Sequence, residues 1–501
     1  MNITDCHIHA MPSENYSAEI KKLISHMEQN GISQAVISDL GNNWLAYPDK
    51  DTLITANRRL QSEVKNSNGR LHYLVYINPK LPDWQEIFDE FISDACGVKL
   101  WISLRSREHG LEKSKDVLRA AQKHCKAVLI HTFDRTSAAP AGEIGINEII
   151  ELANAVPECT IVAAHSGGNW RKAIAKKDDI PNNVCFDISG SYPERTMVSR
   201  LVSAFGADRI LYGSDAFGRS FASQLSKVAF CDFNEEDLEK ILYSNSKKIF
   251  NLPEPPPLSK TDKPNIPISD NKTDNFCFVG KGRYYDHDIT AYTLVNEAEK
   301  CGITKIFAAS LTALTEENKT VLNQKHLLEC KKHSIIHPLA AVDLNNMPEA
   351  LKQLENIDYF AGVIISPYLH NYRLEYDRFA EFFDICSKKA IPLWINTSIG
   401  DDRFRSADLM SRCVNSDEII AFTSAAPYNT YIFQGCGDLV KLSRALPEHC
   451  KLECSKLSDH EYLPEDLLKN GNIDRLVFGT EYPFREYSAV KDILNGKKFF
   501  S

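Results

Sequence analysis

Residues 3–38, ITDCHIHAMPSENYSAEIKKLISHMEQNGISQAVIS, decide the fold of this chain. Two short apolar runs with β-branched residues flank a segment, residues 18–31, whose apolar positions recur at helical spacing and share one face. Gly31 ends that segment, as expected at a helix C-terminus. Strand, helix and strand in this order form the building unit of parallel α/β folds. The apolar face consists of Ile20, Leu23, Ile24 and Met27.

The same unit recurs through residues 1–252. Eight strand-like runs, most of them followed by an amphipathic stretch, give the count of a (β/α)₈ barrel. A doubly wound open sheet is the alternative, and eight units favour the closed barrel. The runs are NITDCHI (2–8), AVISDL (35–40), HYLVYIN (72–78), GVKLW (97–101), AVLIH (127–131), TIVAAH (160–165), NVCFDIS (183–189) and RILYGSD (209–215).

The chain has 501 residues, which is too long for one ordinary domain. Residues 253–275 contain six prolines among polar residues and predict an extended linker. Residues 276–501 then repeat the strand–helix pattern, so we predict two tandem TIM-like barrels. The eight expected strands there are NFCFVGK (275–281), KIFAAS (305–310), IIHPLAAVD (335–343), GVIISPY (362–368), PLWINT (392–397), IIAFTSA (419–425), CKLECS (450–455) and RLVFGTE (475–481).

The two halves resemble each other at three places, which indicates a duplication of a whole domain. SHMEQNGISQAVIS (25–38) corresponds to NEAEKCGITKIFAA (296–309), at an offset of 271 residues. The two other matches pair GVKLW with GVIIS, and DRILYGSDAF with DRLVFGTEYP.

Composition excludes several classes of protein. The net charge is −9, and no block of basic residues is present, so neither nucleic acid nor an acidic membrane surface is an expected partner. No apolar run reaches the roughly 18 residues of a membrane span. The start of the chain has no secretory signal pattern, and the 14 cysteines are scattered without a Cys-x-x-Cys pair. We therefore expect a cytoplasmic protein with reduced thiols.

Polar side chains cluster at the ends of the first eight predicted strands, where active sites of such barrels lie. A single histidine, lysine or aspartate there has ordinary structural explanations, but four histidines and an aspartate together at one rim need a common partner. A divalent metal is such a partner, and imidazole and carboxylate suit zinc, with manganese or iron as alternatives. The residues are His7, His9, Lys99, His131, His165 and Asp215, with Asp187 as a lesser candidate.

The motifs DCHIHA, GVKLW, AVLIHT, AAHSGG, LYGSD and KILYSNSKKIF occur in this order in residues 1–252. Together they resemble the amidohydrolase superfamily, in its branch that includes aminocarboxymuconate-semialdehyde decarboxylase, aromatic-acid decarboxylases and lactone hydrolases. The resemblance implies that His7, His9, His131 and Asp215 bind one metal and that His165 activates or orients water. In some relatives a lysine on the fourth strand is carboxylated and bridges two metals; for Lys99 we favour a place beside a single metal.

The expected reaction is hydrolysis of an amide, lactone or related bond in a small molecule. Asp215 would accept the proton of the attacking water and pass it to the leaving group. Non-oxidative decarboxylation of an unsaturated or aromatic acid is the first alternative, and a non-catalytic binding scaffold is the second. Loops after the strands offer residues for substrate binding, namely Trp44, Arg135, Asn169 and Trp170.

The second half lacks the metal-binding pattern. The offset of 271 pairs His7 with Phe278 and His9 with Gly280, and motif alignment gives counterparts for the other site residues. Three roles remain open: a pseudo-subunit that replaces the second protomer of a dimer, a binding domain, or a metal-free enzyme, with further homo-oligomerisation possible in each case. The remaining counterparts are Ile364 for Lys99, Asn396 for His131, Thr423 for His165 and Glu481 for Asp215. Polar residues on this rim are Lys281, Arg283, Tyr284, His370, Asn396, Glu453 and Glu481.

Overall fold

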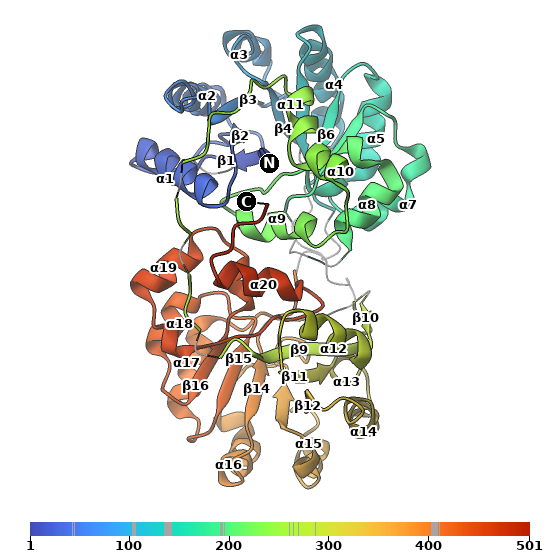
Figure 1. The fold of residues 1–501 in the computed structure, drawn as a ribbon, viewed down its shortest axis with the longest axis vertical. Helices are drawn as coiled ribbons and strands as arrows, with labels where there is room; N and C mark the ends of the chain where they lie inside the picture. The colour runs from blue at the N-terminus through green and yellow to red at the C-terminus, as the bar shows by residue number, and fades with distance from the viewer. Residues whose placement is uncertain are drawn as a thin grey trace. The chain divides into compact units, whose positions relative to one another are not determined.

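The structure is a computed structural model. It describes residues 1–500 except 43, 45, 103–106, 135–142, 191–193, 195, 260, 264, 269, 286, 402–408 and 410. The chain divides into two compact units, drawn in blue to green and in yellow to red in Figure 1. The first comprises Met1–Ser191, Thr196–Lys263 and Lys498–Ser501, and the second comprises Tyr192–Arg195 and Pro264–Lys497.

The first unit is a parallel barrel. In its described residues, eight strands lie in chain order and each pairs in parallel with the next. The barrel closes between β1 and the segment after β8: His9 N–H donates to Ala216 O (2.9 Å), and Asp215 N–H donates to His7 O (2.8 Å). The strands are β1 (Thr4–His9), β2 (Gln34–Ser38), β3 (Leu71–Ile77), β4 (Gly97–Trp101), β5 (Ala127–His131), β6 (Ile161–Ala163), β7 (Val184–Asp187) and β8 (Ile210–Leu211).

Helices surround this barrel (Figure 1). The predicted first helix is α1, in which Ile20, Leu23 and Met27 are buried and Ile24 is half-buried. Asn15 caps it by accepting from Ala18 N–H. The helices are α1 (Tyr16–Gln29), α2 (Lys50–Lys65), α3 (Trp84–Phe91), α4 (Arg107–Lys123), α5 (Ile146–Ala155), α6 (Ala164–Gly167), α7 (Trp170–Ala175), α8 (Met197–Phe205), α9 (Phe221–Ala229), α10 (Glu235–Glu239) and α11 (Asn245–Ile249).

The second unit has the same parallel order with one added antiparallel strand, β10, at the end of β9. Here too the first and last strands are joined, because Phe278 N–H donates to Tyr482 O (2.9 Å) and Glu481 N–H donates to Phe276 O (3.0 Å). The strands are β9 (Thr273–Lys281), β10 (Asp288–Ile289), β11 (Lys305–Ser310), β12 (Ile336–Val342), β13 (Gly362–Ile365), β14 (Leu393–Asn396), β15 (Tyr431–Gln434), β16 (Cys450–Glu453) and β17 (Leu476–Val477).

The strand β9 begins at Thr273, within the segment predicted as linker. Helices of the second unit lie around its sheet as in the first (Figure 1). They are α12 (Ala291–Lys300), α13 (Leu311–Thr315), α14 (Lys319–Cys330), α15 (Met347–Gln353), α16 (Ala380–Lys388), α17 (Ser416–Ala425), α18 (Leu439–Ala445), α19 (Leu463–Asn470) and α20 (Tyr487–Leu494).

The first strands of the two units share one irregularity. Pairing between β1 and β2 shifts register between Asp5 and Ile8, and pairing between β9 and β11 shifts at the equivalent place, before Cys277. Asp5 and Asp274 also make matching bonds, each accepting from the backbone N–H two residues later. These matches support the predicted duplication and set the offset in this strand at 269 residues, because Asp274 takes the place of Asp5.

The predicted counterparts of the first histidine pair are therefore wrong by two residues. Phe276 stands where His7 stands, and Phe278 stands where His9 stands, as the bonds that close each barrel also show. The offset becomes 271 only from the second strand onward, where Ala35 corresponds to Ile306. Two fewer residues therefore separate the first two strands of the first half.

The prediction of the sixth strand in the second half was also wrong. The run IIAFTSA lies in helix α17, and the sixth strand is β15, which follows it. Helix signals precede the run, since Asn415 accepts from Glu418 N–H as an N-cap and two acidic residues occupy the first turn. By strand register His165 corresponds to Gly435, and not to Thr423, which lies on α17.

Two further expectations concern the whole chain. Among the described residues, none of the helices combines the length and apolar character needed to cross a membrane. All 14 cysteines are free thiols, nine of them buried.

Candidate metal centre

Three side chains from the two ends of the first sheet converge at one point. His7 and His9 lie on β1. Asp215 lies in the segment after β8, and the backbone of this segment is hydrogen-bonded to β1. The two Nε2 atoms are 3.1 Å apart, and His9 Nε2 is 3.4 Å from Asp215 Oδ1. One donor atom from each of the three residues lies within 4.8 Å of the others, a spacing that suits a shared metal ion.

A second group of donors shares His7. His7, His165 and Asp187 also bring one donor atom each within 4.8 Å of the others. His131 lies farther along the rim and contacts His165, with 3.2 Å between His131 Nδ1 and His165 Nε2. The structure thus brings together all four histidines and Asp215, with His131 joined to the centre through His165.

Neighbouring side chains fix the orientation of the two β1 histidines. His7 Nδ1 donates to Asp187 Oδ2 (2.9 Å), because a carboxylate only accepts, so its Nε2 carries the lone pair. His9 Nδ1 lies 2.9 Å from Ser38 Oγ, which leaves its Nε2 facing the centre. Both Nε2 atoms therefore lie where they can bind one shared ion.

Lys99 lies on β4 inside the barrel, with no exposed surface. Its Nζ is 2.8 Å from His7 Nε2. Burial lowers the pKa of this ammonium group to about 8, against the opposing effect of Asp215 and Asp187. Lys99 therefore lies in direct contact with a predicted ligand, as the resemblance implied.

The protonation states also fit a metal centre. Burial lowers the pKa of His131, lowers that of His165 well below its usual value, and lowers that of His9 to about 3. The pKa of Asp215 lies well below its usual value: burial raises it, but the surrounding histidines outweigh that effect. At neutral pH the site thus offers uncharged imidazoles and a carboxylate, which are the forms that bind a metal. The residues present therefore fit a divalent ion held by His7, His9 and Asp215.

The backbone around the centre adopts unusual conformations. His165 has φ of 54° and Asp215 has φ of 62°, both in the left-handed region that most side chains avoid. Gly190, with φ of +84°, packs against the His165 ring, and a Cβ there would lie 2.1 Å from Nδ1. Only glycine fits at that position while His165 keeps its orientation.

The residues predicted to bind substrate have different surroundings. The Trp44 ring lies 5.2 Å from the His9 ring, so it borders the centre. The Asn169 side chain caps α7 by accepting from Arg171 N–H and Lys172 N–H, and Trp170 is buried beneath the Arg171 guanidinium. Those contacts explain Asn169 and Trp170 without a substrate, and Arg135 lies outside the described residues.

Sequence reasoning missed several residues that support the centre. Ser38, Ser189, Gly190 and Glu143 touch the predicted ligands through hydrogen bonds or close packing. Glu143 Oε1 is 3.3 Å from His131 Nε2. Position at a strand end was the one available signal for Ser38, which ends β2, while Gly190 and Glu143 lie outside the strands.

We predict that Asp187→Asn lowers metal affinity about 10- to 100-fold, because the carboxylate orients His7 and strengthens it as a ligand. Titration against a chromogenic chelator measures the change. The control is Asp178→Asn, an exposed carboxylate before β7. Equal affinity in the two variants would show that Asp187 does not act through the metal.

The second unit replaces this centre with an internal hydrogen-bond network. The Arg485 guanidinium has no exposed surface and forms an ion pair with Glu481, the counterpart of Asp215. It also donates to both carboxylate oxygens of Asp459, with Nη2 2.9 Å from Oδ2. Glu481 Oε1 accepts from Gln434 Nε2 (2.7 Å) and from Gly400 N–H (3.0 Å). A side-chain cation thus occupies the barrel end where the first unit gathers metal ligands.

Glu453, the counterpart of Asp187, makes the stability of the second unit depend on pH. Burial raises the pKa of its carboxyl to about 7, while Ser455 and Arg485 oppose the rise. The folded chain then keeps a proton that the unfolded chain releases near pH 4.5, so stability falls as pH rises through this window and levels off above about pH 7.

We predict that Glu453→Gln removes a slope of up to about 1.4 kcal/mol per pH unit from the unfolding free energy of the second unit. Urea denaturation from about pH 5 to about pH 8 measures it. Asp274, whose pKa burial raises to about 6, is unchanged in this variant and serves as the internal reference. An unaltered slope above pH 6 would contradict the prediction.

The fold and the site define an enzyme of the (β/α)₈ class with donors for a metal at the C-terminal ends of its strands. Residues 4–252 match the family model described as Amidohydrolase. This half of the chain belongs to that family of enzymes. None of the curated proteins matches the sequence.

Several solved structures resemble one half of the chain. A 2,6-dihydroxybenzoate decarboxylase from Rhizobium shares 14% identity over 50% of this chain and 98% of its own, with a TM-score of 0.40. A dihydroxybenzoic acid decarboxylase from Polaromonas sp. JS666, with bound manganese, shares 14% over 50% and 97%, with a TM-score of 0.39. A Pseudomonas putida protein assigned as a 2-pyrone-4,6-dicarboxylic acid hydrolase shares 17% over 50% and 97%, with a TM-score of 0.38.

Proposed function

We propose that the first barrel hydrolyses an amide, lactone or related bond of a small molecule at a single divalent metal, with zinc the favoured ion. The observation that carries this proposal is the convergence of His7, His9 and Asp215, each with one donor atom within 4.8 Å of the others. A metal bound there supplies Lewis acidity and makes water a nucleophile near neutral pH.

Four residues of the chain have separate roles in the proposed reaction. Asp215 stays ionised and has 22% of its side chain exposed, so it can take the proton of an attacking water and return it to the leaving group. His165, held by Ser189 at 2.9 Å, orients the water or the reacting carbonyl. Trp44, beside His9, offers an aromatic wall against which a planar substrate would stack. Lys99 carries a positive charge close to the centre and would stabilise a developing oxyanion.

Non-oxidative decarboxylation of an unsaturated or aromatic acid is the second candidate, because it would use the same donors and the same cationic lysine. Product analysis separates the two. Carbon dioxide released in proportion to substrate consumed would favour decarboxylation, and a ring-opened or cleaved product without carbon dioxide would favour hydrolysis.

Metal content tests the proposal directly. Elemental analysis of the purified full chain is expected to give about one equivalent of divalent metal, and His9→Ala is expected to lower it. Two equivalents would indicate that Lys99 is carboxylated and bridges two ions. A chain that stays metal-free after incubation with zinc, manganese or iron(II), while still active, would exclude the proposed mechanism.

We also propose that the second barrel takes the structural place of a second protomer in this chain. Sedimentation of the full chain would test this, since a 56.5 kDa monomer is then expected to be active without further association. Activity found only in a larger oligomer would contradict it.

A further inference from the structure

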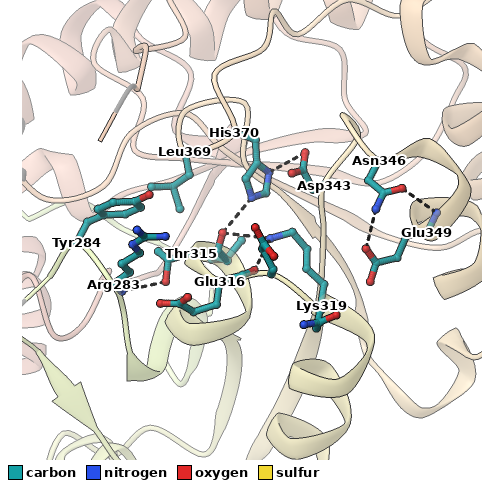
Figure 2. A pocket seen from close by; sticks show the side chains of 13 residues that line it. Arg283, Tyr284, Thr315, Glu316, Lys319, Asp343, Asn346, Glu349, Leu369 and His370 are labelled. Atoms are coloured by element: carbon teal, nitrogen blue, oxygen red, sulfur yellow. Dashed lines mark hydrogen bonds and ion pairs between the residues drawn. The ribbon is translucent and has the colours of Figure 1, made fainter. Parts of the chain in front are cut away.

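The second unit has a pocket of about 580 Å³ among the loops that follow four neighbouring strands (Figure 2). Its lining comes from the segments after β9, β11, β12 and β13, that is, from the C-terminal ends of the strands, where barrels of this type bind ligands. The volume lies within the range of small-molecule sites. This pocket and the Arg485 network are formed by different residues of the second unit.

The pocket holds a buried acceptor with no hydrogen-bond partner. His370 has 7% of its side chain exposed, and its Nε2 lies 3.0 Å from Leu314 O. A carbonyl oxygen only accepts, so Nε2 carries the hydrogen and Nδ1 carries a lone pair. That Nδ1 makes no hydrogen bond.

The group nearest to this nitrogen is another acceptor. Asp343 Oδ1 lies 3.5 Å from His370 Nδ1, and Figure 2 shows the two side chains pointing toward each other. Burial, together with the nearby Lys319, lowers the pKa of His370 to about 4, so the ring is neutral at pH 7 and cannot itself bridge the gap. An imidazole lone pair beside a carboxylate is favourable only when a donor lies between or above them.

The chain supplies no such donor from the nearest cation. Lys319 Nζ donates to three backbone carbonyl oxygens, those of Ala313, Leu314 and Glu316, at 3.0 to 3.3 Å. Its hydrogens are therefore committed to the end of α13 and the turn that follows. Arg283 lies at the exposed side of the pocket, with its guanidinium 5.6 Å from the Tyr284 ring.

The charge of the residues that line the pocket indicates which kind of ligand would donate to His370 and Asp343. Four carboxylates face two cations, and the hydrogens of Lys319 are already bonded to backbone carbonyl oxygens. The balance favours a positively charged ligand over a neutral one. A metal ion is a poorer fit, because groups of three metal-donor residues occur, within the described part of the chain, only in the first unit. The carboxylates are those of Glu316, Glu317, Asp343 and Glu349.

We propose that this pocket binds a small organic amine, whose ammonium group donates to both His370 Nδ1 and the Asp343 carboxylate. The second barrel is then a ligand-binding domain. The inference does not depend on the reaction of the first barrel, because every residue in it belongs to the second unit.

Isothermal titration calorimetry of the full chain with 1,4-diaminobutane tests the proposal. We expect a dissociation constant of about 1 mM or tighter, and at least about a 10-fold loss in Asp343→Asn, which keeps the acceptor for Asn345 N–H but loses the charge. His370→Gln is the second variant, and circular dichroism verifies the folding of both. The matched control is Glu299→Gln, which removes the same charge from another surface hollow of this unit.

Three results would overturn the inference. The first is the absence of diamine binding at about 10 mM, well above the expected dissociation constant. The second is equal binding in wild type, Asp343→Asn and His370→Gln, which would place the diamine elsewhere. The third is equal binding of the uncharged 1,4-butanediol, which would replace the amine with a hydroxyl compound.

Discussion

Replacement of Asp215 by Asn is expected to lower kcat at least about 10³-fold, since one side chain serves as metal ligand and as proton acceptor. An amide binds a metal weakly and accepts no proton near pH 7. Steady-state kinetics with the substrate found by product analysis, together with metal analysis of the same preparation, measure both losses.

The matched control for this variant lies at the other end of the same strand. Asp208 is 75% exposed and precedes β8, whereas Asp215 follows it. Asp208→Asn should retain full metal content and activity within about twofold, as surface changes usually do. Activity in Asp215→Asn equal to that of this control would exclude Asp215 from the mechanism.

The second large effect concerns stability. Arg485→Met leaves the buried Glu481 without its cation and leaves Asp459 only Lys456, at 3.9 Å, so we expect a loss of about 3–5 kcal/mol in the unfolding free energy of the second unit. The magnitude follows from the burial of all three side chains, which deprives the carboxylates of water once the guanidinium is gone. Urea denaturation followed by circular dichroism measures the loss.

Two comparisons make this result interpretable. Arg373→Met removes an arginine that is 71% exposed and should cost no more than about 0.5 kcal/mol. Combining Arg485→Met with Glu481→Gln and Asp459→Asn should restore part of the lost stability, because it removes the stranded charges. A cost below about 1 kcal/mol for Arg485→Met alone would mean that the network contributes little.

The sequence predicted the eight strands of the first half because two signals agreed there, although β6 and β8 end before His165 and Asp215. Apolar runs marked the strands, and His7, His9 and Asp215 followed the rule that residues at those ends share one rim. Strand alternation also placed both β1 histidines on one side. Side-chain partners such as Ser38 carry no comparable signal, because a serine at a strand end is common for many reasons.

The second half shows where such reasoning fails. Ile419, Phe422 and Thr423 are buried on one face of α17, and a short apolar helix of this kind resembles a strand in sequence. The true sixth strand, YIFQ, is equally short. The sequence also did not reveal that the two halves differ by two residues between their first and second strands. The matching motifs GIS and GIT lie after this difference, so they fix the alignment only from that point onward. The pocket around His370 is built from four separate loops, and no local pattern joins them.

Because of the Arg485 guanidinium, we expect the two barrels to respond differently to the loss of metal. In the first barrel the central positive charge would come from a bound metal ion. In the second barrel it is the guanidinium of Arg485, which is part of the chain itself. Loss of the metal would therefore abolish the activity of the first barrel and leave the structure of the second barrel unchanged. The second barrel would stay assembled without metal, and the first would regain activity when metal is added back.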